Sequence, residues 1–387
     1  MSALALNEFF CFTDARTNFD VDPVRDASFL FGDEKWGEGI RQQLRRSIAL
    51  DRPLRIVWIG QYGIGKTHRI HHTMFLIKAD DMALKPIPVT CTDIGDKTGF
   101  ESLQYQLVSN LGFDFVRDLT RKYVRRIEDG DNVPLPEEVS QSRDVASAIR
   151  KLGSDDELAA QAWQYLAGLP VQKDFDYTKY LKVTKPVLNT SVEYASVLGC
   201  IGTIMRVQTG KTLLYLVDQM EGISKITNKA TAARWVETLR AILDLKTVGF
   251  AAAVGAESES LDELPRIFLE PEIVRRFGQD NYIQMKHFQP IEMEKFLQQM
   301  LKVWVDAAKL SELATQQGWT QKSEFDPDTY PFTRPAFNRM ARHLAADAER
   351  AKPSVVIETL NMIAAEAFLA DKRLIGDEVL DENGVNA

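Results

Sequence analysis

Cysteine is scarce in this sequence, which holds only Cys11, Cys91 and Cys200 among 387 residues. An odd number at such wide spacing does not build a disulfide framework or match the ligand spacing of a zinc site. The expected state is buried thiols in a reducing compartment. The longest apolar runs, residues 213–217 and 250–254, are far shorter than the ~20 residues of a membrane span, and the first residues lack the features of a secretory signal. We therefore predict a cytoplasmic protein without membrane contact.

Positive charge is also in deficit. Lys and Arg total 47 against 55 Asp and Glu, which gives a formal charge of −8. A protein that wraps nucleic acid by itself usually carries a basic surface, so this balance argues weakly against that class and leaves a local basic patch open. Apolar residues make up 45% and charged residues 26%. These fractions exclude a disordered chain, a collagen and a coiled-coil rod.

Short apolar runs alternate with helical patterns between about residues 54 and 288. Strands separated by helices predict an α/β fold, in which a parallel sheet carries helices on both faces. The expected strands are residues 55–59, 86–92, 213–217, 248–254 and 282–285, and the expected helices are 65–77, 99–111 and 230–245.

Other segments lie outside this alternation. The tail carries five acidic against two basic residues and is expected to fray. The predicted division is an N-terminal segment at 1–49, a core at 50–289 with a helical insertion at about 113–190, an all-helical segment at 290–370 and an acidic tail at 371–387.

One motif carries chemistry. The residues Gly60, Gln61, Tyr62, Gly63, Ile64, Gly65, Lys66 and Thr67 match G-x-x-x-x-G-K-[ST]. Glycines let such a loop curl so that its backbone N–H groups and the following helix face a phosphate. The lysine reaches the β- and γ-phosphates, and the threonine hydroxyl binds Mg²⁺. The motif lies between an expected strand and an expected helix, which is the context that a nucleotide site requires.

A partner acid is expected at the end of a neighbouring strand. Asp218 follows the apolar run 213–217 and would hold the Mg²⁺ shell together with Thr67. Hydrolysis also needs a group that orients or deprotonates the attacking water. Gln219 stands directly after Asp218, and Glu221 is the next acid. Glu221 is favoured as the base. Two alternatives stay open: Gln219 positions the attacking water, or the site binds ATP and hydrolyses it slowly.

The order of these features resembles that of the AAA+ ATPases. Residues 31–34, before a helical pattern, resemble the N-terminal box that lies against the adenine in that family. Residues 270–277 resemble the box that supplies an arginine finger to the neighbouring subunit, with Arg276 at the finger position and Arg275 beside it. Residues 290–370 resemble the helical lid over the nucleotide. The resemblance implies ATP with Mg²⁺, a lid and a homo-oligomer assembled through the finger interface.

The sequence departs from the AAA+ pattern at several positions. Asp33 stands where the N-terminal box has Arg, and Gln219 stands at the usual position of the base. After the fourth strand, Ser258 is the candidate sensor of the γ-phosphate. Lys352, before Pro353, takes the place of the second sensor arginine. These departures bear on the rate of hydrolysis more than on nucleotide binding.

Two other clusters have competing explanations. His68, His71 and His72 have the spacing of a zinc site, but no suitable acid or cysteine lies nearby, so a packed helix is favoured. The second cluster is a basic helix face that would either contact nucleic-acid phosphates or face solvent. It consists of Arg117, Arg121, Lys122, Arg125 and Arg126.

The resemblance lies closest to initiators, transposition regulators and related ATPases of bacterial defence. Few residues follow residue 370, so we expect a transposition regulator or an anti-phage defence ATPase more than an initiator. The predicted function is an ATPase that oligomerises with nucleotide and regulates a multi-protein machine on DNA, with other proteins and duplex DNA as partners. The alternative is an ATP-gated interaction module that hydrolyses ATP slowly or not at all and recruits a protein effector.

Overall fold

The protein is described by a computed structural model that covers residues 3–13, 16–92, 94, 99–256 and 263–385. The chain forms two compact units, each with its own apolar core. We call residues 40–62 and 73–285 the sheet unit, and residues 1–39, 63–72 and 286–387 the helical unit. Helices α2 (Glu34–Ala49) and α3 (Lys66–Ala79) contribute residues to both.

The sheet unit is built on five parallel strands in the order β2-β3-β4-β1-β5. The strands are β1 (Arg55–Gly60), β2 (Leu84–Thr90), β3 (Thr212–Asp218), β4 (Val248–Gly255) and β5 (Tyr282–Gln284). The central strands are buried along nearly their whole length, which is why they appear in the sequence as continuous apolar runs. The predicted α/β fold is confirmed.

Strand β2 begins two residues before its predicted start at residue 86 and ends two residues before its predicted end at residue 92. It contains Pro86 and Pro88, which cannot donate to a sheet ladder. The strand tolerates them because it lies at the edge and pairs only with β3. The two prolines made the pattern of this strand harder to delimit than that of the central strands.

Helices flank the sheet, with α10 on β3, α11 on β4, α13 on β1 and α4 on β2. They are α4 (Glu101–Ser109), α10 (Ser191–Thr209), α11 (Lys229–Leu243), α12 (Arg266–Leu269) and α13 (Pro271–Phe277), with the short 3₁₀ turns η1 (Met220–Lys225) and η3 (Gln279–Asn281). Helix α10 begins at a capping box, in which Thr190 and Glu193 satisfy each other's backbone N–H groups.

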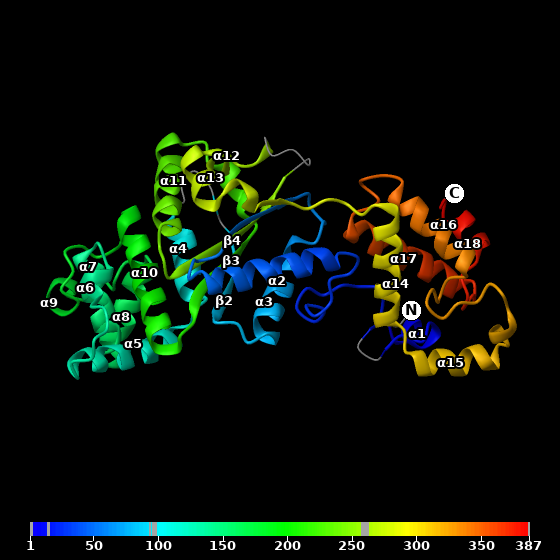
Figure 1. Cartoon of the computed structure of the whole chain (residues 1–387), viewed down its shortest axis with the longest axis horizontal. Coiled ribbons are helices and arrows are strands. Elements are labelled where there is room, and N and C mark those ends of the chain that lie inside the picture. The colour runs from blue at the N-terminus through cyan, green and yellow to red at the C-terminus, as the bar shows by residue number, and fades with distance from the viewer. Residues whose placement is uncertain (1–2, 14–15, 93, 95–98, 257–262, 386–387) are drawn as a thin grey trace. The chain divides into compact units, whose positions relative to one another are not determined.

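Between β2 and β3 the chain adds a cluster of helices beside α10 (Figure 1). They are α5 (Phe113–Glu128), α6 (Pro136–Val139), α7 (Arg143–Leu152), α8 (Asp156–Leu166) and α9 (Tyr177–Tyr180). Their buried side chains join the core of the sheet unit.

The basic face of α5 is used largely within the chain. Arg117 donates to the Ser154 carbonyl at 2.9 Å and to Asp156 at 2.5 Å, at the start of α8. Lys122 pairs with Asp118 and Arg126 with Asp131, each at 2.6 Å, and Arg121 donates to the Gly153 carbonyl. Among the described residues, Arg125 is the one member of this face without such a partner. The contacts favour a structural role for the face over phosphate binding.

The helical unit packs an N-terminal segment against C-terminal helices. Its elements are α1 (Ala3–Phe9), α14 (Pro290–Trp304), α15 (Ala307–Gln316), η4 (Trp319–Gln321), α16 (Arg334–Ala345), α17 (Pro353–Leu369) and α18 (Asp377–Glu382). Within the described part of the chain, no helix combines the length and apolarity that crossing a membrane requires.

The acidic tail does not fray as predicted. Helix α18 buries Val379 and Leu380, and Val385 is buried after it. Arg339 of α16 donates to Asp381 at 2.5 Å and to the Val385 carbonyl at 2.6 Å. The acidic composition suggested solvent exposure, whereas the apolar residues between the acids dock the helix, and Arg339 and Lys372 form ion pairs with three of its acids.

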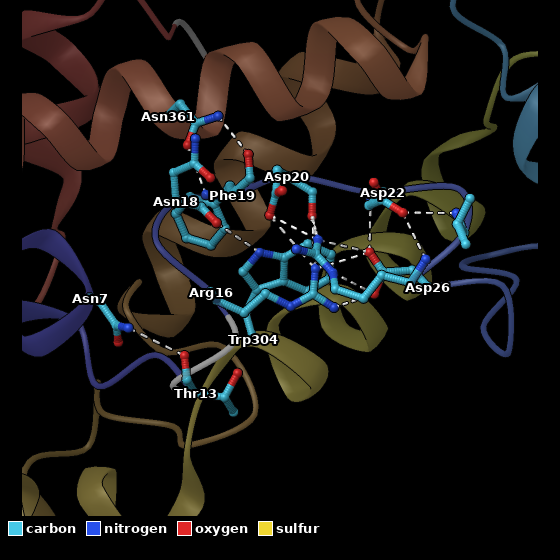
Figure 2. Close-up of polar contacts among 12 residues, drawn as sticks. Asn7, Thr13, Arg16, Asn18, Phe19, Asp20, Asp22, Asp26, Trp304 and Asn361 are labelled. Carbon is cyan, nitrogen blue, oxygen red and sulfur yellow. Dashed lines mark hydrogen bonds and ion pairs between the residues drawn. The ribbon is translucent and has the colours of Figure 1, made fainter. Parts of the chain in front are cut away.

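A buried ion pair fastens the N-terminal segment (Figure 2). Arg16 forms a two-pronged pair with Asp26, and its guanidinium lies 4.0 Å from the ring centre of Trp304. The side chains of Arg16 and Asp26 are 5% and 1% exposed. Burial would raise the pKa of Asp26, but hydrogen bonds from Arg16 and Arg25 outweigh it, so the pKa is lowered. A lowered pKa in the folded chain means that this pair stabilises the fold above the ordinary pKa of 3.8 and that the stabilisation is lost as the pH falls through the folded value.

Further polar contacts bind the same segment to α14 and α17. The Trp304 indole donates to the Asn18 carbonyl at 3.0 Å. The Asn361 side chain accepts from the Phe19 N–H at 2.8 Å and donates to the Phe19 carbonyl at 2.6 Å. The segment is thus held by directional bonds as well as by apolar packing (Figure 2).

We predict that Asp26→Asn lowers the free energy of unfolding by about 3 kcal/mol, because it leaves a buried guanidinium without its carboxylate. Urea unfolding at pH 7 followed by tryptophan fluorescence measures the change. Asp20→Asn is the matched control, since Asp20 is 42% exposed and its pairs with Arg16 and Arg25 should contribute under about 1 kcal/mol. Equal losses in the two variants would contradict a specific stabilising role of the buried Arg16–Asp26 pair.

Candidate functional site

The glycine-rich motif forms the connection between β1 and α3. Strand β1 ends at Gly60 and α3 begins at Lys66, so the lysine and Thr67 lie in the first helical turn, as the motif predicts. Gly63 and Gly65 have φ values of +79° and +92°, in the left-handed region that glycine adopts without a steric penalty. Tyr62 lies at the turn and is 91% exposed. The loop therefore has the glycine-dependent bend that a phosphate cradle needs.

Arg69, near the start of α3, bonds to the backbone of the loop. Its guanidinium donates to the Ile64 carbonyl at 3.2 Å and to Asp33 at 2.5 Å. Burial lowers the pKa of Arg69, and the charge of Asp33 opposes that effect. Position 33, where the resemblance to AAA+ ATPases led us to expect an arginine, thus holds the acidic partner of an arginine on α3. Sequence reasoning missed this pair, although an unexpected acid at position 33 was a signal to look for a displaced arginine.

The first turn of α17 contacts the same loop. The Ser354 N–H lies 3.4 Å from the Gly63 carbonyl, and the Ser354 hydroxyl fills the space that a side chain at position 63 would need. Lys352, the predicted substitute for the second sensor, pairs instead with Glu349, and its side chain is only 13% exposed. Ser354 is therefore the residue of this turn that touches the loop.

The carboxyl ends of the strands meet at one edge of the sheet. Gly60 of β1 lies opposite Gly255 of β4, and β4 in turn pairs with β3, which ends at Asp218. Asp218 is buried and accepts a hydrogen bond from the Gln219 N–H at 2.9 Å. The sheet thus brings the start of the loop and the predicted Mg²⁺ ligand to the same edge.

Glu221 reaches this edge from the turn after β3. Its carboxylate accepts a hydrogen bond from the Gly255 N–H at 2.8 Å, at the end of β4. A side chain at position 255 would collide with the Glu221 carboxylate in this position, so glycine lets that carboxylate lie against the strand end. The structure therefore aligns Glu221 with the strand ends through a backbone bond that the sequence did not reveal.

Gln219 has a different setting from Glu221. It is exposed and its φ is +60°, a left-handed conformation that turns the chain sharply after Asp218.

Ser258, the candidate γ-phosphate sensor, lies outside the described residues. Cys91, after β2, is buried, and burial raises the pKa of its thiol to about 12. That thiol stays protonated at neutral pH and is not a nucleophile.

The two finger candidates differ in their contacts. Arg276 forms a two-pronged pair with Asp244 at 2.7 and 2.8 Å, and its side chain is 14% exposed. Arg275 is exposed and forms no ion pair or hydrogen bond with the described residues. Arg276, at the predicted finger position, is thus paired within its own chain, whereas Arg275 is exposed to solvent.

Two of the three histidines of α3, His68 and His72, are packed as expected. His68 lies 2.7 Å from the Phe29 carbonyl and His72 lies 2.8 Å from the Ala27 carbonyl through ring nitrogens. Burial lowers the pKa of His68 and favours its neutral form. No group of metal-ligating side chains is found in the described ranges.

We predict that Gly63→Ala destabilises the chain by about 1–2 kcal/mol through its positive φ, with a further loss from the collision with Ser354. Adding Ser354→Gly removes the collision and leaves the strain, so the double variant should recover part of the loss. Thermal and urea unfolding measure both. Gly39→Ala, where a new side chain meets open space, is the control. An unchanged stability in Gly63→Ala would contradict the loop conformation.

Comparison with known proteins gives a likeness in fold. No protein-family model and no curated protein sequence matches the chain. The ORC2 protein of Aeropyrum pernix, in its ADPNP–ADP complexes, aligns over 96% of this chain and 71% of its own, with a TM-score of 0.50 and 11% identity.

Two further solved structures align with lower scores. Cdc6p from Pyrobaculum aerophilum covers 90% of this chain and 65% of its own, with a TM-score of 0.47 and 9% identity. The Walker-type ATPase PABY2304 of Pyrococcus abyssi covers 92% and 79%, with a TM-score of 0.34 and 11% identity. At these identities the comparison concerns the fold alone. The alignment with the ORC2 protein agrees with the predicted α/β P-loop architecture.

Proposed function

We propose that the chain binds ATP with Mg²⁺ at the loop Gly60–Thr67 and hydrolyses it. The observation that carries this proposal is the sheet edge, where the glycine loop leaves β1, Asp218 ends β3 and Glu221 contacts the end of the intervening strand β4. A phosphate loop, an oxygen ligand for the metal and a second carboxylate are the groups that nucleotide hydrolysis uses. The complexes of the ORC2 protein with ADPNP and ADP support the nucleotide class.

The residues fit a magnesium nucleotide. The Thr67 hydroxyl and the Asp218 carboxylate are oxygen donors of the kind that Mg²⁺ prefers. The Gln219 N–H fixes one Asp218 oxygen at the strand end, which keeps the carboxylate in place. Lys66 would contact the β- and γ-phosphates, and the N–H groups of the loop would hold them. The metal, when bound, neutralises phosphate charge during transfer.

Glu221 acts as the general base in this proposal. The hydrogen bond from Gly255 fixes one carboxylate oxygen and leaves the other able to accept a proton from water. Gln219 has a supporting role, since its exposed amide could orient the water but cannot take up a proton.

The chain is proposed to work as an assembly of copies. An arginine supplied by a neighbouring subunit would stabilise the charge of the transferring phosphate, so turnover would depend on assembly. Arg275 is the better candidate for this contact, because Arg276 would first have to leave Asp244. The machine that the assembly regulates is proposed to act on DNA, in transposition or anti-phage defence, through protein partners and with duplex DNA as a further ligand.

A second function is favoured by the hydrogen bond between Glu221 and Gly255. If this bond persists with ATP bound, Glu221 is held at the end of β4, and turnover is slow if the attacking water lies beyond the reach of its second oxygen. The chain would then be an ATP-gated module that recruits a protein effector. Cytoplasmic location is common to both proposals.

We predict that Glu221→Gln lowers ATP turnover about a hundredfold or more while ATP binding is retained, because the amide oxygen still accepts from Gly255 but cannot take up a proton. Phosphate release and binding of a fluorescent ATP analogue measure the two quantities. Gln219→Gly is the comparison, since glycine tolerates the φ of +60° at this position. A larger loss in Gln219→Gly would assign the water-positioning role to Gln219, and no loss in either would favour the slow module.

We predict that wild-type turnover per subunit rises with protein concentration, and further with duplex DNA, and that Arg275→Ala abolishes the rise. The expected loss at high concentration is about a thousandfold, the scale of an arginine finger. Arg276→Ala is expected to lower stability through loss of the Asp244 pair. Arg266→Ala, whose side chain is 92% exposed, is the control. Turnover that is independent of concentration would contradict shared active sites.

A further inference from the structure

A cleft of about 1040 Å³ opens in the sheet unit at the amino ends of the strands, at the edge opposite to Asp218 and Glu221. It lies among the end of α2, the approach to β1 and the connections that precede β4 and β5. Its charged lining residues are the cations Arg46, Arg52, Arg55, Lys246 and Arg276 and the carboxylates Asp51, Asp244 and Asp280.

Two of the three carboxylates are already neutralised. Asp244 is held by Arg276, and Asp51 accepts from Arg206 at 2.6 Å. Within the described part of the chain Asp280 has no ion pair. Four cations of the lining also lack an ion pair with the described residues: Arg46, Arg52, Arg55 and Lys246. They outnumber the one unpaired carboxylate, Asp280. The cleft therefore presents an excess of positive charge on a chain whose overall charge is −8.

Arg55 is the least satisfied of these cations. It is partly buried, and its two terminal nitrogens reach the Arg276 and Leu245 carbonyls only at 3.4 Å. Its Nε is buried without a hydrogen-bond partner among the described residues. Burial lowers the pKa of Arg55, Asp244 opposes this, and the nearby charge of Arg276 adds to it. A buried charge without a carboxylate partner is unfavourable, and an anion in the cleft would offset that cost.

We propose that this cleft binds a small phosphate-bearing anion of nucleotide size, with Arg55, Arg52 and Lys246 as its ligands. Guanidinium groups bind phosphate oxygens in pairs, and several cations around one space suit a multiply charged anion. The cleft volume of about 1040 Å³ lies at the upper end of the range for small-molecule sites, so there is room for a nucleotide-sized anion. A duplex would reach the exposed Arg52 and Lys246, whereas the partly buried Arg55 in a concave cleft is accessible to a small ligand. This site is separate from the phosphate loop and does not rest on the function proposed above.

The test uses the full chain with Lys66→Ala, which weakens the phosphate loop, and inorganic triphosphate as the probe. Isothermal titration calorimetry is expected to find one equivalent bound. Adding Arg55→Gln or Lys246→Gln should weaken binding about tenfold each. Arg125→Gln removes the same charge from an exposed, unpaired arginine of α5 and should change the affinity less than twofold, about the scale of a distant surface charge. Lys246 is exposed, so its variant remains informative if Arg55→Gln fails to fold.

Three results would overturn the proposal. One is the absence of binding to the Lys66→Ala chain. Another is binding that is insensitive to Arg55→Gln and Lys246→Gln, which would assign the probe to the residual loop. The third is displacement of triphosphate by a short DNA duplex at lower concentration than by ATP, which would assign the cations to a nucleic-acid backbone. Every variant in this test carries Lys66→Ala, so the absence of binding to the cleft would not bear on the proposed ATPase activity of the phosphate loop.

Discussion

The parallel pairing of β1 with β4 and β5 is the constraint on which the candidate site depends. It sets Gly60 opposite Gly255 and thereby brings the start of the phosphate loop to the same edge as the end of β3. Trp58 and its neighbours in β1 are buried on both faces of the sheet, so a shift by one residue would exchange the side chains packed on each face. Backbone groups of the sheet then position the side chains, as the bond from Gly255 to Glu221 demonstrates.

The conformation of the glycine loop depends on contacts from other segments, because glycine has no side chain that could fix the loop. Arg69 provides one such contact by joining the Ile64 carbonyl to Asp33. The Arg69 side chain is buried and the Asp33 side chain is partly exposed. Loss of Asp33 would leave a buried guanidinium without its carboxylate, which is strongly unfavourable. Ser354 contacts the other side of the loop at Gly63. The loop is thus shaped by residues that lie far from it in the sequence.

The sequence allowed prediction of the features that short patterns encode. The strands were predictable as buried apolar runs, and the phosphate loop as a motif between a strand and a helix. Asp218 was placed correctly at a strand end, although its function stays a prediction. The pairing of Asp33 with Arg69 and of Asp244 with Arg276 could not be predicted, because each joins residues more than 30 positions apart. Tertiary contacts of this kind leave no local periodicity.

The same reason explains the error about the acidic tail. Its composition suggested exposure to solvent, yet its apolar residues are buried and Arg339 pairs with Asp377 and Asp381. On the basic face of α5, Arg117 binds the start of α8, whereas Arg125 stays exposed. Several charged residues that form clusters in the sequence are therefore paired with other residues of the chain. Four cations that lack an ion pair with the described residues are instead scattered along the sequence, at positions 46, 52, 55 and 246, and the sheet gathers them into one cleft. The two edges of the sheet consequently differ in charge. Carboxylates stand at the carboxyl edge, where a metal nucleotide would need them, and cations stand at the amino edge, where they favour an anion.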